Sequence, residues 1–156
     1  MINLENIELI IGNSGRNFSG GTSITIQLLD YQEKEMNLAI LGSRFIPEHF
    51  TTLNYLQFLL LTRTKLPSGK LRVFYTRKNN EMIQGLIAKY IFRSKIKIIF
   101  SSSAQRNHTK FTKWLMSKMD SVVSTSRKAG SYLDKEPDKI ISHGIDLNRF
   151  SLPEDK

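Results

Sequence analysis

A histidine lies near the end of a polar loop that follows a strongly apolar predicted strand. The loop of residues 101–109 comes after the run Ile96–Phe100 and contains Ser102, Arg106 and His108. An imidazole in such a loop can hydrogen-bond a sugar hydroxyl or exchange a proton with it. The position is equally compatible with a histidine near a helix start that has no catalytic role. We take His108 as the candidate catalytic residue, and Ser102 and Arg106 as candidate binding residues.

A glycine-containing loop follows the first predicted strand and leads into the first predicted helix. It ends at Gly20, Gly21 and Thr22, where glycines let a ligand approach backbone N–H groups at the positive end of a helix. An anion or a sugar would suit this loop. The residues match neither G-x-G-x-x-G nor G-x-x-x-x-G-K-[ST], so dinucleotide-binding and P-loop sites are excluded on the residues. A flexible loop without a ligand is the structural alternative.

A third candidate group lies where the predicted strand 71–76 meets the following helix. Arg77, Asn80 and Glu81 stand there together with Lys78, and two cations beside an acid can bind a sugar or a phosphate. Each residue also has a structural explanation: an asparagine caps the helix, Glu81 favours its N-terminus, and Arg77 is solvated. From these residues alone, the structural explanation is favoured.

Strands and helices that alternate along the chain must position these groups. Hydrophobic periodicity predicts strands at 7–12, 37–42, 71–76, 96–100, 121–125 and 139–142, and helices at 22–34, 53–62, 79–91, 108–119 and 126–133. This order is typical of an α/β fold, with a Rossmann-like, mostly parallel sheet of about six strands flanked by helices. Each candidate group follows the carboxyl end of a predicted strand, so we expect all of them at one edge of the sheet.

Composition favours one soluble domain. The 156 residues are 40% hydrophobic and include no cysteine, which excludes disulfides and thiolate metal sites and agrees with a reducing cytoplasm. No metal or cofactor is predicted. The start Met1–Glu5 does not resemble a secretory signal, and the aliphatic cluster at 53–61 is far shorter than the ~20 residues that span a bilayer.

Positive charge is concentrated in the middle of the chain. Residues 63–128 contain 16 basic and 2 acidic side chains, net +14, whereas residues 1–62 carry net −3 and residues 129–156 net −2. Such a segment attracts phosphate-rich partners, which include nucleic acid, an anionic membrane or a phosphorylated glycolipid. Ordinary solvated lysines on a basic protein explain it about as well.

The end of the chain contains a motif of strand, glycine turn and helix start. Ile140 and Ile141 suit a buried strand, and the hinge motif His143, Gly144 and Asp146 follows them. The string H-G-I-D-x-x-R-F resembles the motif that closes the first domain of family 4 glycosyltransferases, whose cleft lies between two Rossmann-like domains (the GT-B fold). The resemblance implies one acceptor-side domain at 1–150, the start of the interdomain connection at 151–156, and a donor-binding domain that this sequence does not contain.

An ordered series of motifs narrows the resemblance. The stretches 77–85 and 100–109, Met119-Asp120, and 143–146 together are similar to those of the lipopolysaccharide core mannosyltransferases, and the similarity runs from about Ile7 to Phe150. It implies a retaining mannosyltransferase with GDP-mannose as donor substrate and a lipid A–core saccharide as acceptor. It also implies a cytoplasmic location, peripheral to the anionic inner membrane.

The resemblance has two departures. Many family 4 enzymes have a histidine directly after the fourth strand, where this chain has Ser101 and Ser102, and its histidine comes only at His108. The second is the donor-binding half, with its basic residues and paired glutamates, for which no counterpart follows Lys156. We therefore expect acceptor binding without transfer unless a separate donor-binding domain complements the chain.

Two other functions remain open. One is a non-catalytic pseudo-enzyme that binds a saccharide. The other is a basic nucleic-acid-binding protein, suggested by aromatic residues within the basic segment, although the sequence lacks a recognition motif and no specific nucleic acid is expected. Phe111, Trp114 and Leu115 lie at helical spacing, and we interpret them as core contacts.

Overall fold

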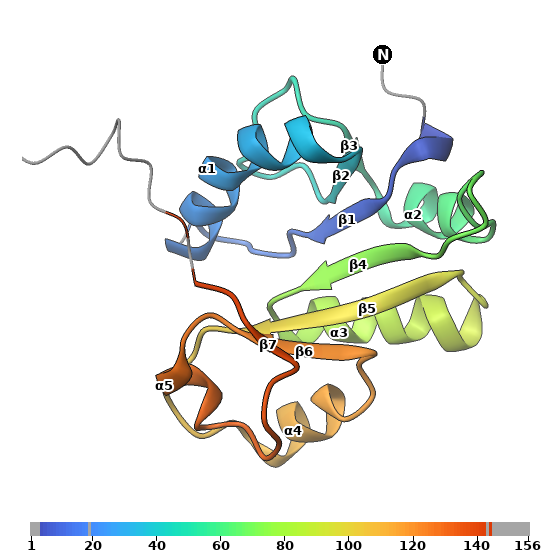
Figure 1. Ribbon diagram of the computed structural model, residues 1–156. Helices are drawn as coiled ribbons and strands as arrows, with labels where there is room; N and C mark the ends of the chain where they lie inside the picture. The colour runs from blue at the N-terminus through green and yellow to red at the C-terminus, as the bar shows by residue number, and fades with distance from the viewer. Residues whose placement is uncertain (1–3, 19, 143, 145–156) are drawn as a thin grey trace, which may run out of the picture.

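Parallel strands form the centre of the protein, as described by a computed structural model for residues 4–18, 20–142 and 144. The seven strands pair in the order β3-β2-β1-β4-β5-β6-β7, and every pairing is parallel (Figure 1). The strands are β1 Leu9–Gly12, β2 Leu38–Leu41, β3 Thr52–Leu53, β4 Arg72–Thr76, β5 Ile96–Ser102, β6 Ser121–Ser124 and β7 Lys139–Ile140. The predicted α/β, Rossmann-like fold is confirmed.

Helices connect the strands in the predicted alternation. They are α1 Gly20–Glu35, α2 Tyr55–Thr62, α3 Asn79–Leu86, α4 Lys110–Met116 and α5 Arg127–Gly130, with a 3-10 turn at Leu4–Asn6. Asn54 caps α2, since its side chain accepts a hydrogen bond from Gln57 N. Thr109 caps α4 through Thr112 N, and Ser126 caps α5 through Ala129 N. Capping side chains therefore define the starts of three helices.

The structure corrects the predicted elements at three points. Ile140 and Ile141 were expected in a buried strand but are 44% and 54% exposed, because β7 is a short strand at the edge of the sheet. Leu53 was expected to begin a helix at 53–62, but Thr52 and Leu53 pair with Ile40 and Leu41 as the edge strand β3, which gives seven strands in place of about six. The helix predicted at 79–91 continues after α3 as a π-helical turn at Ile87–Ile91. Hydrophobic spacing alone cannot distinguish a π turn from an α turn over so short a stretch.

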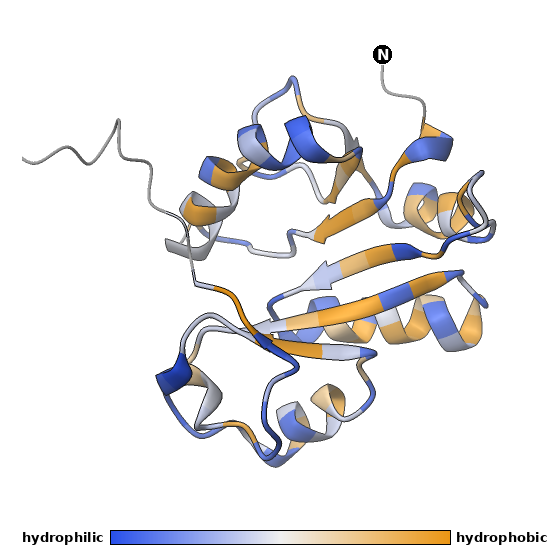
Figure 2. Cartoon of the chain, in the orientation of Figure 1, coloured by the Kyte–Doolittle hydropathy of each residue, from blue (hydrophilic) through white to orange (hydrophobic). Residues whose placement is uncertain are grey.

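The two faces of the sheet are covered by different helices. On one face, Phe58 of α2 and Ala88 after α3 pack with Ile10, Phe74 and Ile98. Figure 2 shows apolar residues along these central strands and mixed polarity on the helices. Side chains that are neighbours along a strand point to opposite faces, so the adjacent residue of β1 packs on the other side, against α1.

That second face contains a separate cluster, formed by Leu29 of α1 with Ile11, Leu38 and Ile40. A third cluster extends the first face towards β6, where Leu115 of α4 packs with Met82 and Phe100. Of the three residues interpreted above as core contacts, only Leu115 is buried. Phe111 and Trp114 are exposed, because α4 turns only one side towards the sheet.

The middle of α3 lies very close to the sheet. A Cβ added at Gly85 would lie 2.9 Å from Phe74 Cδ1 and 3.1 Å from Ile98 Cδ1. Both neighbours are fully buried, so they have little room to move. Gly85 therefore sets the distance between α3 and the strands β4 and β5, whose carboxyl ends form part of the site described below.

We predict that Gly85→Ala lowers the free energy of unfolding by about 1 kcal/mol. Overpacking a core costs roughly 1–3 kcal/mol, which outweighs the ~1 kcal/mol by which alanine favours a helix over glycine. Urea denaturation measures the change. Gly20→Ala is the control, because nothing lies within 4 Å of a Cβ added there. Equal or greater stability of Gly85→Ala would contradict the close packing.

Candidate functional site

The strand order reverses at β1, because β2 and β3 lie on one side of it and β4 to β7 lie on the other. In open parallel sheets, ligands bind in the crevice outside the carboxyl ends of the two strands at such a reversal. Here these strands are β1 and β4, which end at Gly12 and Thr76. The loops that follow them are therefore the first candidates for ligand contacts.

A buried carboxylate joins these two loops. Glu81 lies in the first turn of α3 and has 0% exposed surface. Its Oε1 accepts hydrogen bonds from the amide and hydroxyl of Ser14, at 3.1 and 2.9 Å. Its Oε2 accepts from the amides of Arg77 and Lys78, at 2.8 and 3.2 Å. Glu81 thus fixes the positions of both loops through these hydrogen bonds. A direct contact between Glu81 and a ligand stays a prediction.

Glycine makes this arrangement possible at the end of β1. A Cβ added at Gly12 would lie 3.0 Å from three atoms of the Glu81 side chain. Any larger residue at this position would therefore press on the buried carboxylate. The pair of Gly12 on β1 and Glu81 on α3 connects two segments 69 positions apart in the sequence.

Arg77 fixes the start of α1 to the same edge. Its Nη1 donates to the carbonyl of Gly21 at 2.7 Å and to the hydroxyl of Thr25. Its Nη2 lies 3.4 Å from the carbonyl of Gly12. Its two terminal nitrogens therefore face acceptors of the protein itself, whereas its buried Nε has no hydrogen-bond partner within the described residues. It holds the first turn of α1, where Gly20 and Gly21 are exposed.

Cations line the rim of the loop after β1. A Cβ added at Gly15 would lie 2.7 Å from Lys78 Nζ, so the ammonium group lies directly over the backbone of this glycine. Arg44 reaches across from the loop after β2 and donates to the carbonyl of Arg16 at 2.8 Å. These cations would attract a negatively charged ligand to the point where the strand order reverses, between β1 and β4.

The loop between β5 and α4 forms the second part of the site. Ser102, the last residue of β5, is buried, and its Oγ lies 3.2 Å from His108 Nε2. Burial lowers the pKa of His108, the cations Arg106 and Lys113 lower it further, and Asp134 acts in the opposite direction. The imidazole is therefore neutral at neutral pH, with one N–H donor and one acceptor nitrogen.

A hydrogen bond between two helix starts links the two parts. Asn79 Nδ2, in the first turn of α3, donates to Thr112 Oγ1 in α4 at 2.9 Å. Thr112 is also bonded to Thr109, the residue that caps α4 and follows His108. The first turn of α3 is therefore connected through Glu81 to the loops after β1 and β4, and through Asn79 to the His108 loop.

All the predicted site residues within the described chain lie at the carboxyl edge of the sheet or just beyond it. The structure brings Arg77 to Gly21 and Ser102 to His108. Asn80 and Arg106 are exposed, and Thr22 is buried. These residues are Gly20, Gly21 and Thr22 at the start of α1, Arg77, Asn80 and Glu81 around the start of α3, and Ser102, Arg106 and His108 after β5.

The hinge motif is described only in part. Gly144 is exposed, and a Cβ added there would lie 3.9 Å from Leu28 of α1, which is ordinary van der Waals distance. His143 and Asp146 lie outside the described residues. The helix start predicted at Asp146 therefore stays a prediction.

Sequence reasoning missed Asn13, which ties the loop after β1 to the loop after β2. Its Nδ2 donates to the carbonyls of Gly42 and Arg44, at 3.1 and 2.9 Å. Gly42 has a φ of +107°, and a Cβ added there would lie 2.5 Å from the carbonyl oxygen of Asn13. Gly42 as the last residue of the predicted strand 37–42 was the available signal, because a glycine there marks a close approach of two backbones.

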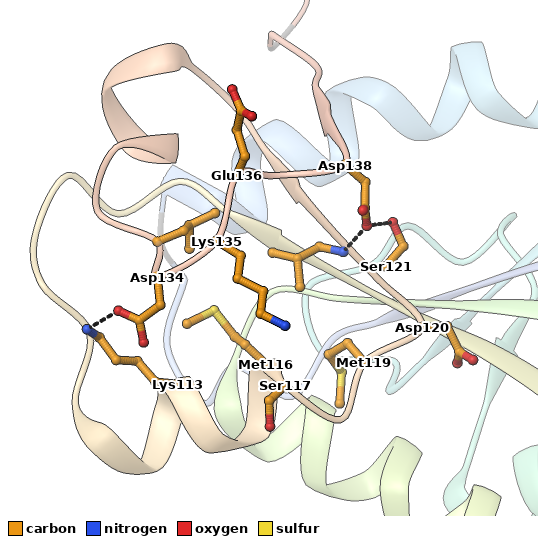
Figure 3. A pocket seen from close by; sticks show the side chains of 12 residues that line it. Lys113, Met116, Ser117, Met119, Asp120, Ser121, Asp134, Lys135, Glu136 and Asp138 are labelled. Carbon is orange, nitrogen blue, oxygen red and sulfur yellow. Dashed lines mark hydrogen bonds and ion pairs between the residues drawn. The ribbon is translucent and has the colours of Figure 1, made fainter.

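A cavity of about 330 Å³ is lined by none of the predicted site residues. Met116, Met119, Val122 and Leu133 supply its apolar lining, between the end of α4 and the start of β6. Figure 3 shows the Lys113–Asp134 ion pair at its side, where the two charged atoms are 2.5 Å apart. The lining reaches the first residues of β6, and none of the predicted site residues belongs to it, although Lys113 and Asp134 also act on the pKa of His108.

Two further searches covered the described residues. Within 4–18, 20–142 and 144, no group of three or more histidine, cysteine, aspartate or glutamate side chains could hold a metal ion. In the same part of the chain, no helix has both the length and the apolar character needed to cross a membrane.

Comparison with known proteins agrees with the resemblance described above. The chain is 39% identical over 155 residues to the lipopolysaccharide core biosynthesis mannosyltransferase LpcC of Rhizobium leguminosarum bv. viciae. It is 35% identical over 158 residues to the lipopolysaccharide core biosynthesis mannosyltransferase LpsB of Rhizobium meliloti (strain 1021). The chain is homologous to both proteins.

The similarity covers the chain much more fully than it covers the relatives. The alignments include 99% and 100% of this chain, but only 43% of LpcC and 44% of LpsB. The chain therefore spans less than half the length of the curated relatives it matches. No protein-family profile matches it.

We predict that Glu81→Gln lowers the free energy of unfolding by about 1–3 kcal/mol. An amide can replace only one of the two carboxylate oxygens, so its NH₂ group would face backbone N–H donors that then lose their acceptor. Urea denaturation measures the change, with exposed Asn80→Ala as the control. If both variants have wild-type stability, the hydrogen bonds of Glu81 do not hold the two loops.

The lowered pKa of His108 predicts that its ionisation makes stability depend on pH. The unfolded chain binds a proton near pH 6.5 and the folded chain only at lower pH. Stability from this group is therefore fully present above pH 6.5 and is lost as the pH falls through that value towards the folded pKa.

When the pH is lowered from 7 to 5, the free energy of unfolding of His108→Gln should fall by less than that of the wild-type chain. Urea denaturation at both pH values measures the two changes. Proton NMR titration of the His108 ring should give a midpoint below 6.5. A midpoint above 6.5 would contradict the neutral imidazole, and equal pH dependence of both chains would assign the effect to other groups.

Proposed function

We propose that this chain forms the acceptor-side domain of a glycosyltransferase that adds mannose to the core of lipopolysaccharide. The observation that carries the proposal is the similarity, over practically the whole chain, to two proteins named lipopolysaccharide core biosynthesis mannosyltransferases. The parallel sheet supports it, because glycines and cations follow the carboxyl ends of β1 and β4, where ligands bind in open parallel sheets, and His108 follows the neighbouring strand β5.

A second domain completes the enzyme in this proposal, as in the GT-B fold. The relatives are more than twice as long as the chain they match, since it spans 43–44% of them. We assign the donor, GDP-mannose, mainly to that further part. Residues 1–150 form the acceptor-side domain, and residues 151–156 begin the connection.

The residues described above then act on the acceptor. The neutral imidazole of His108 can accept a hydrogen bond from an acceptor hydroxyl and so orient it towards the reacting carbon. Asn80 and Arg106 are exposed, and in this proposal they bind sugar hydroxyls or phosphate. Glu81 and Arg77 act less directly, because they fix the loops that carry the other groups.

The proposal also includes a location. A lipid A–core acceptor is anchored in a membrane, so the enzyme works at the anionic cytoplasmic face of the inner membrane. The net charge of +14 in residues 63–128 suits a surface with negative lipids and a phosphorylated acceptor.

We predict that the 156 residues alone do not transfer mannose at a detectable rate. Loss of a single charge-stabilising group costs roughly 10²–10³ in rate in other enzymes, and the proposal assigns the whole donor diphosphate site to another domain. The assay measures radiolabelled mannose transferred from GDP-mannose to a truncated lipopolysaccharide core. It is run with the chain alone and then with the part of LpcC that the chain does not match.

In the complemented reaction, His108→Ala and Gly21→Val should abolish the restored activity. Exposed Lys70→Gln lies before β4, at the opposite edge of the sheet, and serves as the control. Turnover by the chain alone would refute the assignment of the donor site. If calorimetry detects acceptor binding but mannose is transferred neither by the chain alone nor by the complemented chain, the protein is instead a non-catalytic saccharide-binding protein.

A further inference from the structure

Two large aromatic side chains are exposed side by side on the outer face of α4. Phe111 is 51% exposed and Trp114 is 53% exposed, whereas Leu115 on the inner face is 1% exposed. The two rings stack on each other, with centroids 6.1 Å apart and planes 19° apart. Exposed aromatic clusters of this kind indicate an interaction surface more often than isolated exposed apolar residues do.

Exposed lysines lie on both sides of the aromatic pair along the chain. Lys110, the first residue of α4, and Lys118, in the turn after the helix ends at Met116, are both exposed. Lys113 is different, because Asp134 pairs with it at 2.5 Å. We define the α4 surface as Lys110, Phe111, Trp114 and Lys118.

We infer that the α4 surface docks the protein onto an anionic lipid bilayer. Tryptophan and phenylalanine rings bury favourably at the boundary between headgroups and acyl chains, and lysines beside them are attracted to anionic headgroups. The outer side of a helix is convex, which suits a planar bilayer. Single-stranded nucleic acid binds instead in a positively charged groove that tracks its backbone.

Other exposed apolar residues differ in charge or in position, and the exposed Phe18–Phe45 pair stands beside Arg44, whose guanidinium is already bonded to the carbonyl of Arg16. Leu56 and Leu60 are exposed on α2, but none of the eight residues of α2 is charged. Residues 90–92 are also exposed, but they precede β5 and so lie at the amino edge of the sheet. Charge distinguishes α4 from α2, and position distinguishes it from residues 90–92, which have the exposed cations Arg93 and Lys95 beside them.

Docking through α4 would place the candidate site beside the membrane. His108 is two residues before α4 begins, and the capping residue Thr109 lies between them. A saccharide that extends from a membrane-anchored lipid would meet the loop of residues 103–109 first. The inference therefore rests on the proposed function for its biological acceptor, but the docking itself is measured without any sugar transfer.

Trp114 is the only tryptophan of the chain, so its fluorescence reports directly on this surface. We expect its emission to shift to shorter wavelength when the chain binds vesicles of equal parts phosphatidylcholine and phosphatidylglycerol. Lipids brominated on their acyl chains should quench it, because the indole enters the bilayer. Binding by sedimentation with unshifted, unquenched emission would overturn the inference.

Substitutions distinguish binding through the α4 surface from nonspecific binding through any exposed apolar residue. Phe111→Ser combined with Trp114→Ser should reduce partition into the anionic vesicles by about tenfold or more, since both rings lose their apolar burial. Lys110→Gln combined with Lys118→Gln should weaken binding and reduce its salt dependence. The matched control is Leu56→Ser combined with Leu60→Ser, whose side chains are 65% and 58% exposed.

Each remaining outcome also decides the question. Equal losses for the α4 and α2 pairs, equal binding to vesicles of phosphatidylcholine alone, or tighter binding to a single-stranded oligonucleotide would each overturn the inference. Circular dichroism checks that every variant is folded. Transfer to a delipidated core oligosaccharide by the complemented enzyme tests the proposed function separately, because this reaction needs no membrane and should be unaffected by the α4 variants.

Discussion

The buried carboxylate of Glu81 is the interaction on which the candidate site depends. A fully buried charge is costly unless hydrogen bonds replace the water that it loses. Here the hydroxyl of Ser14 and three backbone amides supply that replacement. Two loops from different strands must therefore keep one fixed geometry for the charge to remain buried. The site is consequently built into the folded state, because loops that separated would leave the carboxylate without partners.

The general fold could be predicted from the sequence because it depends on patterns that repeat locally. Apolar strands alternate with amphipathic helices, and this alternation leads to a parallel sheet with few topological alternatives. The errors occurred where the pattern was too short to decide. Thr52 and Leu53 form only a two-residue edge strand, and the end of the helix predicted at 79–91 adopts a π turn within the same apolar stripe.

The candidate site could be predicted only in its position, since the carboxyl ends of parallel strands meet at one edge. The partners of each side chain depend on contacts between distant segments. Nothing in the neighbourhood of Glu81 indicates that it would be buried beneath residues 14, 77 and 78. Phe111 and Trp114 show a second limit of prediction from sequence, which concerns burial. Helical spacing identified a common face with Leu115, but it could not tell which side of a short helix meets the sheet.

Main-chain atoms form most of the bonds to Glu81, and this has an evolutionary consequence. Three of its four hydrogen-bond donors are backbone amides, which every amino acid except proline provides. The side chains of these loop residues can therefore be exchanged over generations while the loop backbone keeps its shape. Acceptor preference can diverge among relatives through such exchanges without a new fold for each saccharide. Glycine at position 12 and glutamate at position 81 are the residues least free to vary in that process.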